Sequence, residues 1–270
     1  MKLLRRFLFV VLALGGTFAV FAQNLEPAPA NKPADKPLDP ALVAVADLPG
    51  LPRVLLIGDS ISIGYTLPVR AALAGRANVH RPAQNCGDTA RGLVNLTKWL
   101  GAGPWDVIHF NFGLHDLKYL DAQGKYVPPE QGKQVASPEV YRERLREFTL
   151  RLRATAPDAK LVFATTTPVP EGTTGRVAGD EARYNAVAIA LFRELGVAVN
   201  DLGDFVREEQ RKLPPRPLSQ KQPGGKQLPA REGELQLPFN VHFTTAGYAA
   251  LAAESVKAIE PLLPPPKPLP

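Results

Sequence analysis

The sequence is poor in the residues that hold metals and disulfide frameworks. Among its 270 residues there are one cysteine, Cys86, and four histidines. A single cysteine excludes an internal disulfide bond and a cysteine-based zinc site, so a packed core must hold the fold together. The histidines have no close spacing, and the chain has no His-Glu-x-x-His pattern and no glycine-rich phosphate loop. These absences argue against metal and nucleotide chemistry, and we expect no cofactor.

Half of the formal net charge of +6 comes from the first 22 residues. Three of the basic residues lie in Met1–Ala22, ahead of an apolar run that ends in small residues. This arrangement is typical of a secretory signal peptide cut after Ala22, and the run is shorter than the ~20 residues of a membrane-spanning helix. Cleavage lowers the net charge to +3. We expect a secreted or periplasmic protein with no membrane span after cleavage. Nucleic acid is not an expected partner, because no basic run with interleaved aromatics remains.

Proline-rich segments flank a single expected domain. Residues 23–52 are rich in proline and alanine and predict an extended, poorly ordered linker, and residues 264–270 form a proline-rich tail. The domain then covers residues 53–263. Within it, residues 213–238 are polar and contain several prolines, which predicts an insertion that is either disordered or a loop over the site.

Short apolar runs alternate with helical patterns along this domain. The predicted strands are Val54–Ile57, a short run from Val79, Asp106–Phe112, Lys160–Thr166 and Val197–Val199. The predicted helices are Tyr65–Ala74, Ala90–Leu100, a segment that begins at Ser137-Pro138, Asp180–Leu195 and Thr245–Leu262, and a loop is expected over Asp121–Ala136. Alternation of this kind predicts an α/β fold, a three-layer α/β/α sandwich with a central five-stranded parallel sheet in a flavodoxin-like arrangement.

Polar residues follow the predicted strands where their carboxyl ends should meet. Ser60 comes directly after the first strand on a Gly58-Asp59 turn, which makes it a candidate nucleophile or, in the simpler interpretation, a helix cap. Gly87-Asp88 follows the second strand and residues 113–116 follow the third, while His242 precedes the last helix. His80 and His109 are interpreted as strand residues without partners.

These motifs, in this order, resemble those of the SGNH (GDSL-type) hydrolase family of esterases and lipases over residues 53–262. The resemblance implies that Ser60 attacks an ester carbonyl and that His242 is its base. It also implies an oxyanion hole made by the backbone N–H groups of Ser60 and Gly87 and by a side chain after the third strand. Asp59 and Asp116 are the expected supporting residues.

Two positions depart from the family pattern. His115 stands where the family has asparagine, and an imidazole can still donate one N–H to an oxyanion. Phe239 stands three residues before His242, where the family has its acid. Asn240 or a backbone carbonyl is therefore the expected partner of the histidine, and a carboxylate brought in by the fold remains an alternative. The candidates for that carboxylate are Asp201, Asp204, Glu232 and Glu234.

The sequence thus predicts a secreted serine esterase that hydrolyses small O-acyl esters, most plausibly acetyl esters on carbohydrate. The expected partner is a small-molecule or glycan ester, and the sequence predicts no oligomeric state. The alternative is a catalytically weak or inactive carbohydrate-binding or scaffold protein on the same fold, with Phe239 as the mark of lost catalysis.

Overall fold

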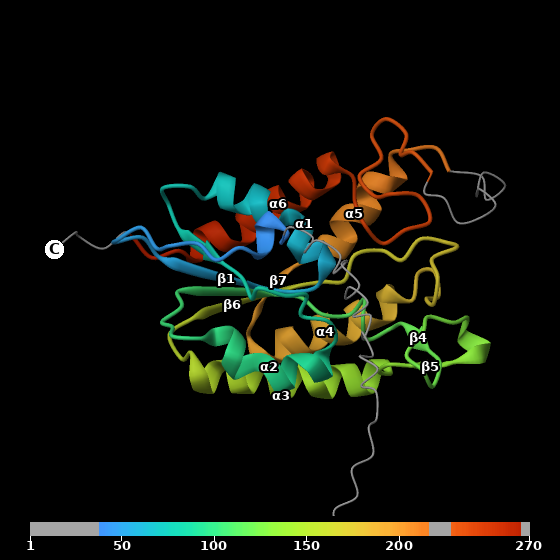
Figure 1. Ribbon diagram of the computed structural model, residues 1–270, viewed down its shortest axis with the longest axis horizontal. Helices are drawn as coiled ribbons and strands as arrows, with labels where there is room; N and C mark the ends of the chain where they lie inside the picture. The colour runs from blue at the N-terminus through green and yellow to red at the C-terminus, as the bar shows by residue number, and fades with distance from the viewer. Residues whose placement is uncertain (1–37, 216–227, 266–270) are drawn as a thin grey trace, which may run out of the picture. The chain divides into compact units, whose positions relative to one another are not determined.

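The chain folds into alternating strands and helices (Figure 1). The computed structural model describes residues 38–215 and 228–265. In chain order the elements are η1 (Pro40–Leu42), β1 (Arg53–Ile57), α1 (Ser60–Ala72), β2 (Asn78–His80), α2 (Thr89–Leu100), β3 (Val107–Phe110), β4 (Tyr119–Leu120), η2 (Pro129–Gln131), β5 (Lys133–Gln134), α3 (Pro138–Thr155), β6 (Lys160–Ala164), α4 (Glu181–Leu195), β7 (Ala198–Asn200), α5 (Leu202–Arg211), α6 (Thr245–Ile259) and η4 (Glu260–Leu262). The elements labelled η are 3₁₀ helices.

The five-stranded parallel sheet that the sequence predicts is present. Its strand order is β2-β1-β3-β6-β7, and every neighbouring pair is parallel. The order reverses at β1, which pairs with β2 on one side and β3 on the other. In open α/β sheets ligands bind outside the carboxyl ends of the strands at such a reversal. The residues that follow β1 and β3 are therefore the first to consider as a site.

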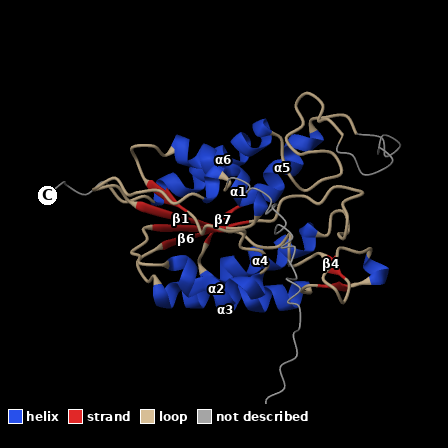
Figure 2. Cartoon of the chain, viewed as in Figure 1, coloured by secondary structure: helices blue, strands red, loops and turns tan. Residues whose placement is uncertain are grey.

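Helices cover both faces of the sheet and give the three expected layers. Helices α1, α5 and α6 lie on one face, and α2, α3 and α4 lie on the other (Figures 1 and 2). Buried aromatic rings fill the interface between the sheet and helices α3 and α4. The ring centroid of Phe110 in β3 lies 5.6 Å from that of Phe148 in α3 and 5.7 Å from that of Phe192 in α4. Such pairs typically add about 0.5–1.5 kcal/mol to the gain from area burial. This packing makes the sheet a rigid support for the loops at its edge.

The helix after β1 begins earlier than the sequence pattern predicts. Helix α1 starts at Ser60 instead of Tyr65, because the side chain of Asp59 caps it by accepting a hydrogen bond from the backbone N–H of Ile61. Because of this earlier start, Pro68 lies inside α1 and not in its first turn.

Helix α5 and the elements between β3 and α3 were not predicted. Helix α5 follows β7 directly and carries no apolar stripe long enough to be recognised in the sequence, since only three of its residues are buried: Leu202, Gly203 and Val206. The expected loop of residues 121–136 contains the 3₁₀ helix η2 and strand β5, which pairs antiparallel with β4. A short hairpin therefore projects from the sheet edge beyond β3, near the labels β4 and β5 in Figure 1.

Residues 38–52 were expected to belong to an extended, poorly ordered linker, and this expectation is wrong for them. The side chain of Asn78 bonds the backbone of Leu48, with the Leu48 N–H to Oδ1 distance at 2.8 Å. Asp47 pairs with Arg53 at 3.0 Å. The compact unit accordingly begins at Leu38 rather than at the predicted residue 53.

Some predictions fall on residues outside the described ranges. They are the signal peptide of residues 1–22, the linker up to residue 37, the central part of the insertion and the last residues of the tail. Among the residues that are described, no helix is both long and apolar enough to cross a membrane.

Candidate active site

Ser60 lies where β1 passes into α1. Gly58 makes the turn possible, because a Cβ there would lie 1.9 Å from Oδ1 of Asn111. Asp59, not Ser60, supplies the side chain that caps the helix. The Ser60 hydroxyl is therefore not needed for capping, and Ser60 is the first residue of a 13-residue helix. A backbone N–H at that position is one of the unsatisfied donors at the positive end of the helix dipole.

His242 reaches Ser60 from the other end of the sequence. Its Nε2 lies 2.9 Å from Oγ of Ser60, across a sequence separation of 182 residues. Its Nδ1 lies 2.9 Å from Oδ1 of Asn240, which also accepts the backbone N–H of His242 at 3.0 Å. Because an amide oxygen only accepts, the contact requires the proton on Nδ1 and leaves Nε2 free to accept from the serine hydroxyl. The arrangement is a Ser-His pair oriented by an amide.

A carboxylate does not occupy the third position. Within residues 38–215 and 228–265, no carboxylate oxygen lies within salt-bridge distance of a ring nitrogen of His242. Of the acids that the sequence left open, Asp201 accepts from Thr165 at 2.7 Å and Glu234 pairs with Arg231 at 2.8 Å. Asp204 lies 3.9 Å from both Arg207 and Arg211. Phe239, at the usual acid position, has a left-handed backbone with φ of 56° and lines a cavity of about 780 Å³.

Helix packing holds the His242 segment beside Ser60. Thr244 caps α6 by accepting the N–H of Gly247 at 2.9 Å, so His242 lies just before the helix begins. The ring of Tyr248 in α6 lies against Gly64 of α1, where a Cβ would be 2.1 Å from the ring. Only glycine allows this close approach of the two helices.

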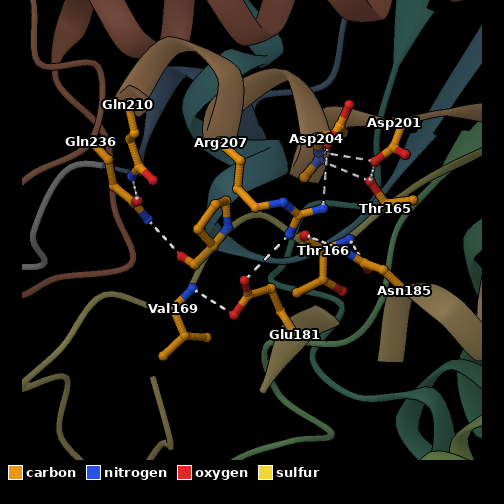
Figure 3. Close-up of polar contacts among 12 residues, drawn as sticks. Thr165, Thr166, Val169, Glu181, Asn185, Asp201, Asp204, Arg207, Gln210 and Gln236 are labelled. Atoms are coloured by element: carbon orange, nitrogen blue, oxygen red, sulfur yellow. Dashed lines mark hydrogen bonds and ion pairs between the residues drawn. The ribbon is translucent and has the colours of Figure 1, made fainter. Parts of the chain in front are cut away.

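A buried glutamine fastens the same segment to the sheet edge. Gln236 donates through Nε2 to the carbonyl oxygens of Pro168 at 2.8 Å and Val241 at 3.1 Å, and it accepts from Gln210 of α5 at 2.8 Å. Figure 3 shows Gln236 and Gln210 facing each other in this network. The sequence pattern did not single out either glutamine. The signal for Gln236 is an amide between two leucines, and nothing in the sequence pairs it with Gln210.

The neighbouring loop after β6 is held by a buried acid. Glu181 accepts the backbone N–H of Val169 at 3.0 Å and lies 3.4 Å from Arg207 of α5 (Figure 3). Helix α5 thus joins the loop after β6 to the segment that carries His242.

His115 follows β3 at the same edge and approaches a lysine. Its Nδ1 lies 3.2 Å from Nζ of Lys118. Burial is the main effect that lowers the pKa of His115; Asp59 and Asp88 oppose it, and Lys118 and Arg176 add to it. Lys118 and Arg176 were not candidates in the sequence, although Lys118 is only three residues from His115.

Gly87 follows β2 with a φ of +70°, which favours glycine. Its N–H is engaged, because it donates to Oδ1 of Asn85 at 2.9 Å. A substrate oxygen must therefore share this N–H with the Asn85 side chain or displace that side chain from it. Asp116, in the loop after β3, anchors the same region, since its carboxylate accepts both the N–H and the hydroxyl of Thr89 at the start of α2. Burial raises the pKa of Asp116 to about 7.

Asp59 is fully buried beneath the site. One carboxylate oxygen caps α1, and in the described part of the chain the other has no hydrogen-bond partner. Burial lowers the pKa of His242, and the negative charge of Asp59 raises it. Asp59 is therefore an acid whose charge acts on His242 without a hydrogen bond between the two side chains.

The remaining histidines have structural partners, and the cysteine is buried beside the site, where its N–H donates to the carbonyl of Gly58 at 3.1 Å. The expectation that His80 and His109 have no partners is wrong, since His80 contacts Asp47 and His109 lies 3.1 Å from the amide of Asn200. Cys86 is buried, and burial raises its pKa to about 11, which disfavours a thiolate.

Comparisons with known proteins show the family and the fold. The model of the GDSL-like Lipase/Acylhydrolase family matches residues 56–250. No curated protein sequence matches the chain significantly. Many solved structures share its fold at low identity. A lipase/acylhydrolase from Enterococcus faecalis is 18% identical with a TM-score of 0.57, and the match covers 81% of this chain and 100% of that one.

Two of the proteins with similar structures are acetylxylan esterases. One, AlAXEase, has a TM-score of 0.58 at 15% identity and covers 77% of this chain and 99% of its own. The other, from Geobacillus stearothermophilus, has a TM-score of 0.54 at 15% identity and covers 77% and 94%. At these identities the similarity shows the fold alone.

Proposed function

Because this chain belongs to the GDSL-like lipase/acylhydrolase family and is an ester-hydrolysing hydrolase, we propose that it is a secreted serine esterase that removes small acyl groups, acetyl above all, from carbohydrate. The observation that carries the chemistry is the 2.9 Å contact between Ser60 Oγ and His242 Nε2.

The proposed acylation step uses this contact directly. Ser60 Oγ attacks the ester carbonyl carbon while His242 Nε2 takes the hydroxyl proton, and the carbonyl π electrons move to oxygen to form a tetrahedral oxyanion. Collapse of this intermediate breaks the bond to the alcohol, which leaves with the proton that His242 returns. Asn240 holds the ring in the orientation and tautomer that both transfers need.

Three donors are proposed for the oxyanion: the backbone N–H groups of Ser60 and Gly87 and Nε2–H of His115. Removing one such donor typically costs about 10²–10³ in kcat. The Gly87 N–H first has to leave Asn85, which gives the other two donors more weight. Deacylation repeats the sequence, with His242 taking a proton from water and Ser60 leaving as the hydroxyl.

Two observations support the proposed substrate class. The acetylxylan esterases among the similar folds act, by their names, on acetyl groups of a polysaccharide. The leader-like residues 1–22 favour action outside the cytoplasm, where such polymers are met. The missing carboxylate beside His242 is what the alternative of an inactive scaffold rests on. The hydrogen bond that the serine and histidine keep favours the esterase.

The test uses p-nitrophenyl acetate and a fluorophosphonate probe. Ser60→Ala is expected to abolish hydrolysis, the acylation burst and covalent labelling. Ser62→Ala is the matched control, since it removes a buried serine two residues along the same helix and should keep activity and labelling. Full activity in Ser60→Ala would overturn the assignment. Release of acetate from acetylated xylan, compared with a long-chain ester, then tests the substrate class.

A further inference from the structure

The contact between Lys118 and His115 has a fixed direction. Nζ of Lys118 lies 3.2 Å from Nδ1 of His115. An ammonium group has three N–H donors and no lone pair, so it can only donate. Nδ1 must therefore accept, and a neutral imidazole that accepts at Nδ1 carries its proton on Nε2. The contact selects one of the two tautomers of His115.

The backbone and an aromatic ring hold Lys118 in this place. Its carbonyl accepts the N–H of Val135 at 3.0 Å, next to the β4–β5 hairpin. Its ammonium lies 5.3 Å from the ring centroid of Tyr126. Among the residues that the structure describes, no carboxylate forms an ion pair with Lys118. No ion pair there competes with its hydrogen bond to His115.

We propose that Lys118 is a positioning residue that holds His115 as the Nε2–H tautomer, so that Nε2–H faces the oxyanion. This inference rests on the proposed function, which gives His115 the oxyanion role. Nε2 of His115 makes no hydrogen bond within residues 38–215 and 228–265. An asparagine amide always presents an N–H, whereas an imidazole presents one only if its proton is on the correct nitrogen.

The charges around His115 also favour its neutral form. A charged ring would carry an N–H on Nδ1, pointing at the ammonium of Lys118. Arg176, whose Nε donates to the carbonyl of Leu114 at 2.9 Å, adds a second positive charge. Asp59 and Asp88 act in the opposite direction, and burial reinforces the two cations. Lys118 therefore acts on both the charge and the tautomer of the ring.

The first experiment removes the donor while keeping the length of the side chain. Lys118→Met is expected to lower kcat on p-nitrophenyl acetate about tenfold with little change in KM, the size expected from loss of one charge-assisted hydrogen bond. Lys118→Arg should restore most of the rate, because it returns a charged donor. Lys133→Met, an exposed lysine on the same hairpin, is the control and should behave as wild type.

A double-mutant cycle tests whether Lys118 acts through His115. In a His115→Asn background the amide donor needs no tautomer selection, so adding Lys118→Met should change kcat less than twofold. An equal loss in both backgrounds, or no loss in either, would overturn the proposal.

The pH dependence gives a readout that a merely structural role would not move. Without Lys118 the pKa of His115 rises, and the protonated ring again has Nε2–H. The ratio of Lys118→Met to wild-type kcat/KM should therefore increase as pH falls, and His242 cancels from this ratio. A ratio that stays constant with pH contradicts the inference.

Nitrogen NMR of His115 separates this inference from the proposed function. The Nε2–H tautomer is expected in wild type and a mixture in Lys118→Met, with the signal identified by its loss in His115→Asn. This result would stand even if Ser60→Ala showed that the serine is not the nucleophile. The Nδ1–H tautomer in wild type would overturn the proposal for Lys118 alone.

Discussion

The side-chain oxygen of Asn240 lies 2.9 Å from Nδ1 of His242, in the role that a carboxylate has in a Ser-His-Asp triad. An amide oxygen orients the ring as an acid would, but it carries no charge to stabilise the imidazolium formed during attack. Replacing the acid by an amide in a serine protease triad costs about 10⁴ in kcat through the wrong tautomer. Here the geometry favours the correct tautomer, so only the electrostatic part of that loss is expected.

Asn240→Asp should raise kcat, by about tenfold to 10³-fold, because it puts a charge on the atom that already accepts from Nδ1. The measurement is kcat on an acetyl ester above the pKa of His242, beside a thermal melt. Asn240→Leu is the matched control and should lose activity. A folded Asp variant slower than wild type would show that the charge does not help.

Phe239→Asp is the second route to an acid, at the position where the family keeps one. The backbone φ of 56° favours the change, since aspartate tolerates this region better than phenylalanine. We expect a higher kcat in the folded protein, with some loss of packing against the cavity that Phe239 lines. Phe239→Asn, which has the same shape and backbone tolerance without charge, separates the two effects. Equal rates for both variants would contradict a gain from charge.

The Asn85 side chain competes with the substrate for the N–H of Gly87. Asn85→Ala should raise kcat/KM about twofold to tenfold, the net worth of one hydrogen bond. Asn85→Asp should lower it, because a carboxylate holds the N–H more strongly and repels the oxyanion. A rate that falls equally in both variants would mean that Gly87 does not donate during the reaction and that Asn85 only shapes the turn.

Activity should rise with pH as His242 loses its proton, because only the neutral ring can act as base. The ordinary pKa of a histidine side chain predicts this rise near pH 6–7. Burial lowers the pKa of His242, Asp59 opposes this, and Arg176 lowers it further, so the rise should come below pH 6.5. Arg176→Gln is expected to move the rise to higher pH, while Arg176→Lys keeps the charge and the profile. A profile unchanged in Arg176→Gln would show that this arginine does not act on His242.

Asp116 makes stability depend on pH. Its pKa is raised to about 7 in the folded chain by burial, above the ordinary value near 4. Its contribution to the free energy of unfolding is therefore fully present below about pH 4 and is lost as pH rises through about 7. Asp116→Asn keeps an acceptor for Thr89 and should melt higher relative to wild type at pH 8 than at pH 4. A difference in melting temperature that does not change with pH would contradict the shifted pKa.

The sequence by itself determined the architecture and singled out Ser60 and His242, which the structure brings within hydrogen-bond distance. Short apolar runs such as Val54–Ile57 are typical of central parallel strands, and polar residues after the strands then share one sheet edge. Local rules also made Ser137 and Gly196 visible as helix ends. They did not reveal α5, whose few buried residues give no clear pattern.

Only the tertiary structure decided which groups serve the reacting pair. That Asn240 and not Asp201 faces His242 depends on how the segment before α6 folds back, held by Gln236. The roles of Lys118 and Asn85 depend on which group donates and which accepts in contacts of 3.2 and 2.9 Å. These partners are only two or three residues apart in the sequence, but each side chain could reach other groups until the sheet and helices hold its loop in one conformation.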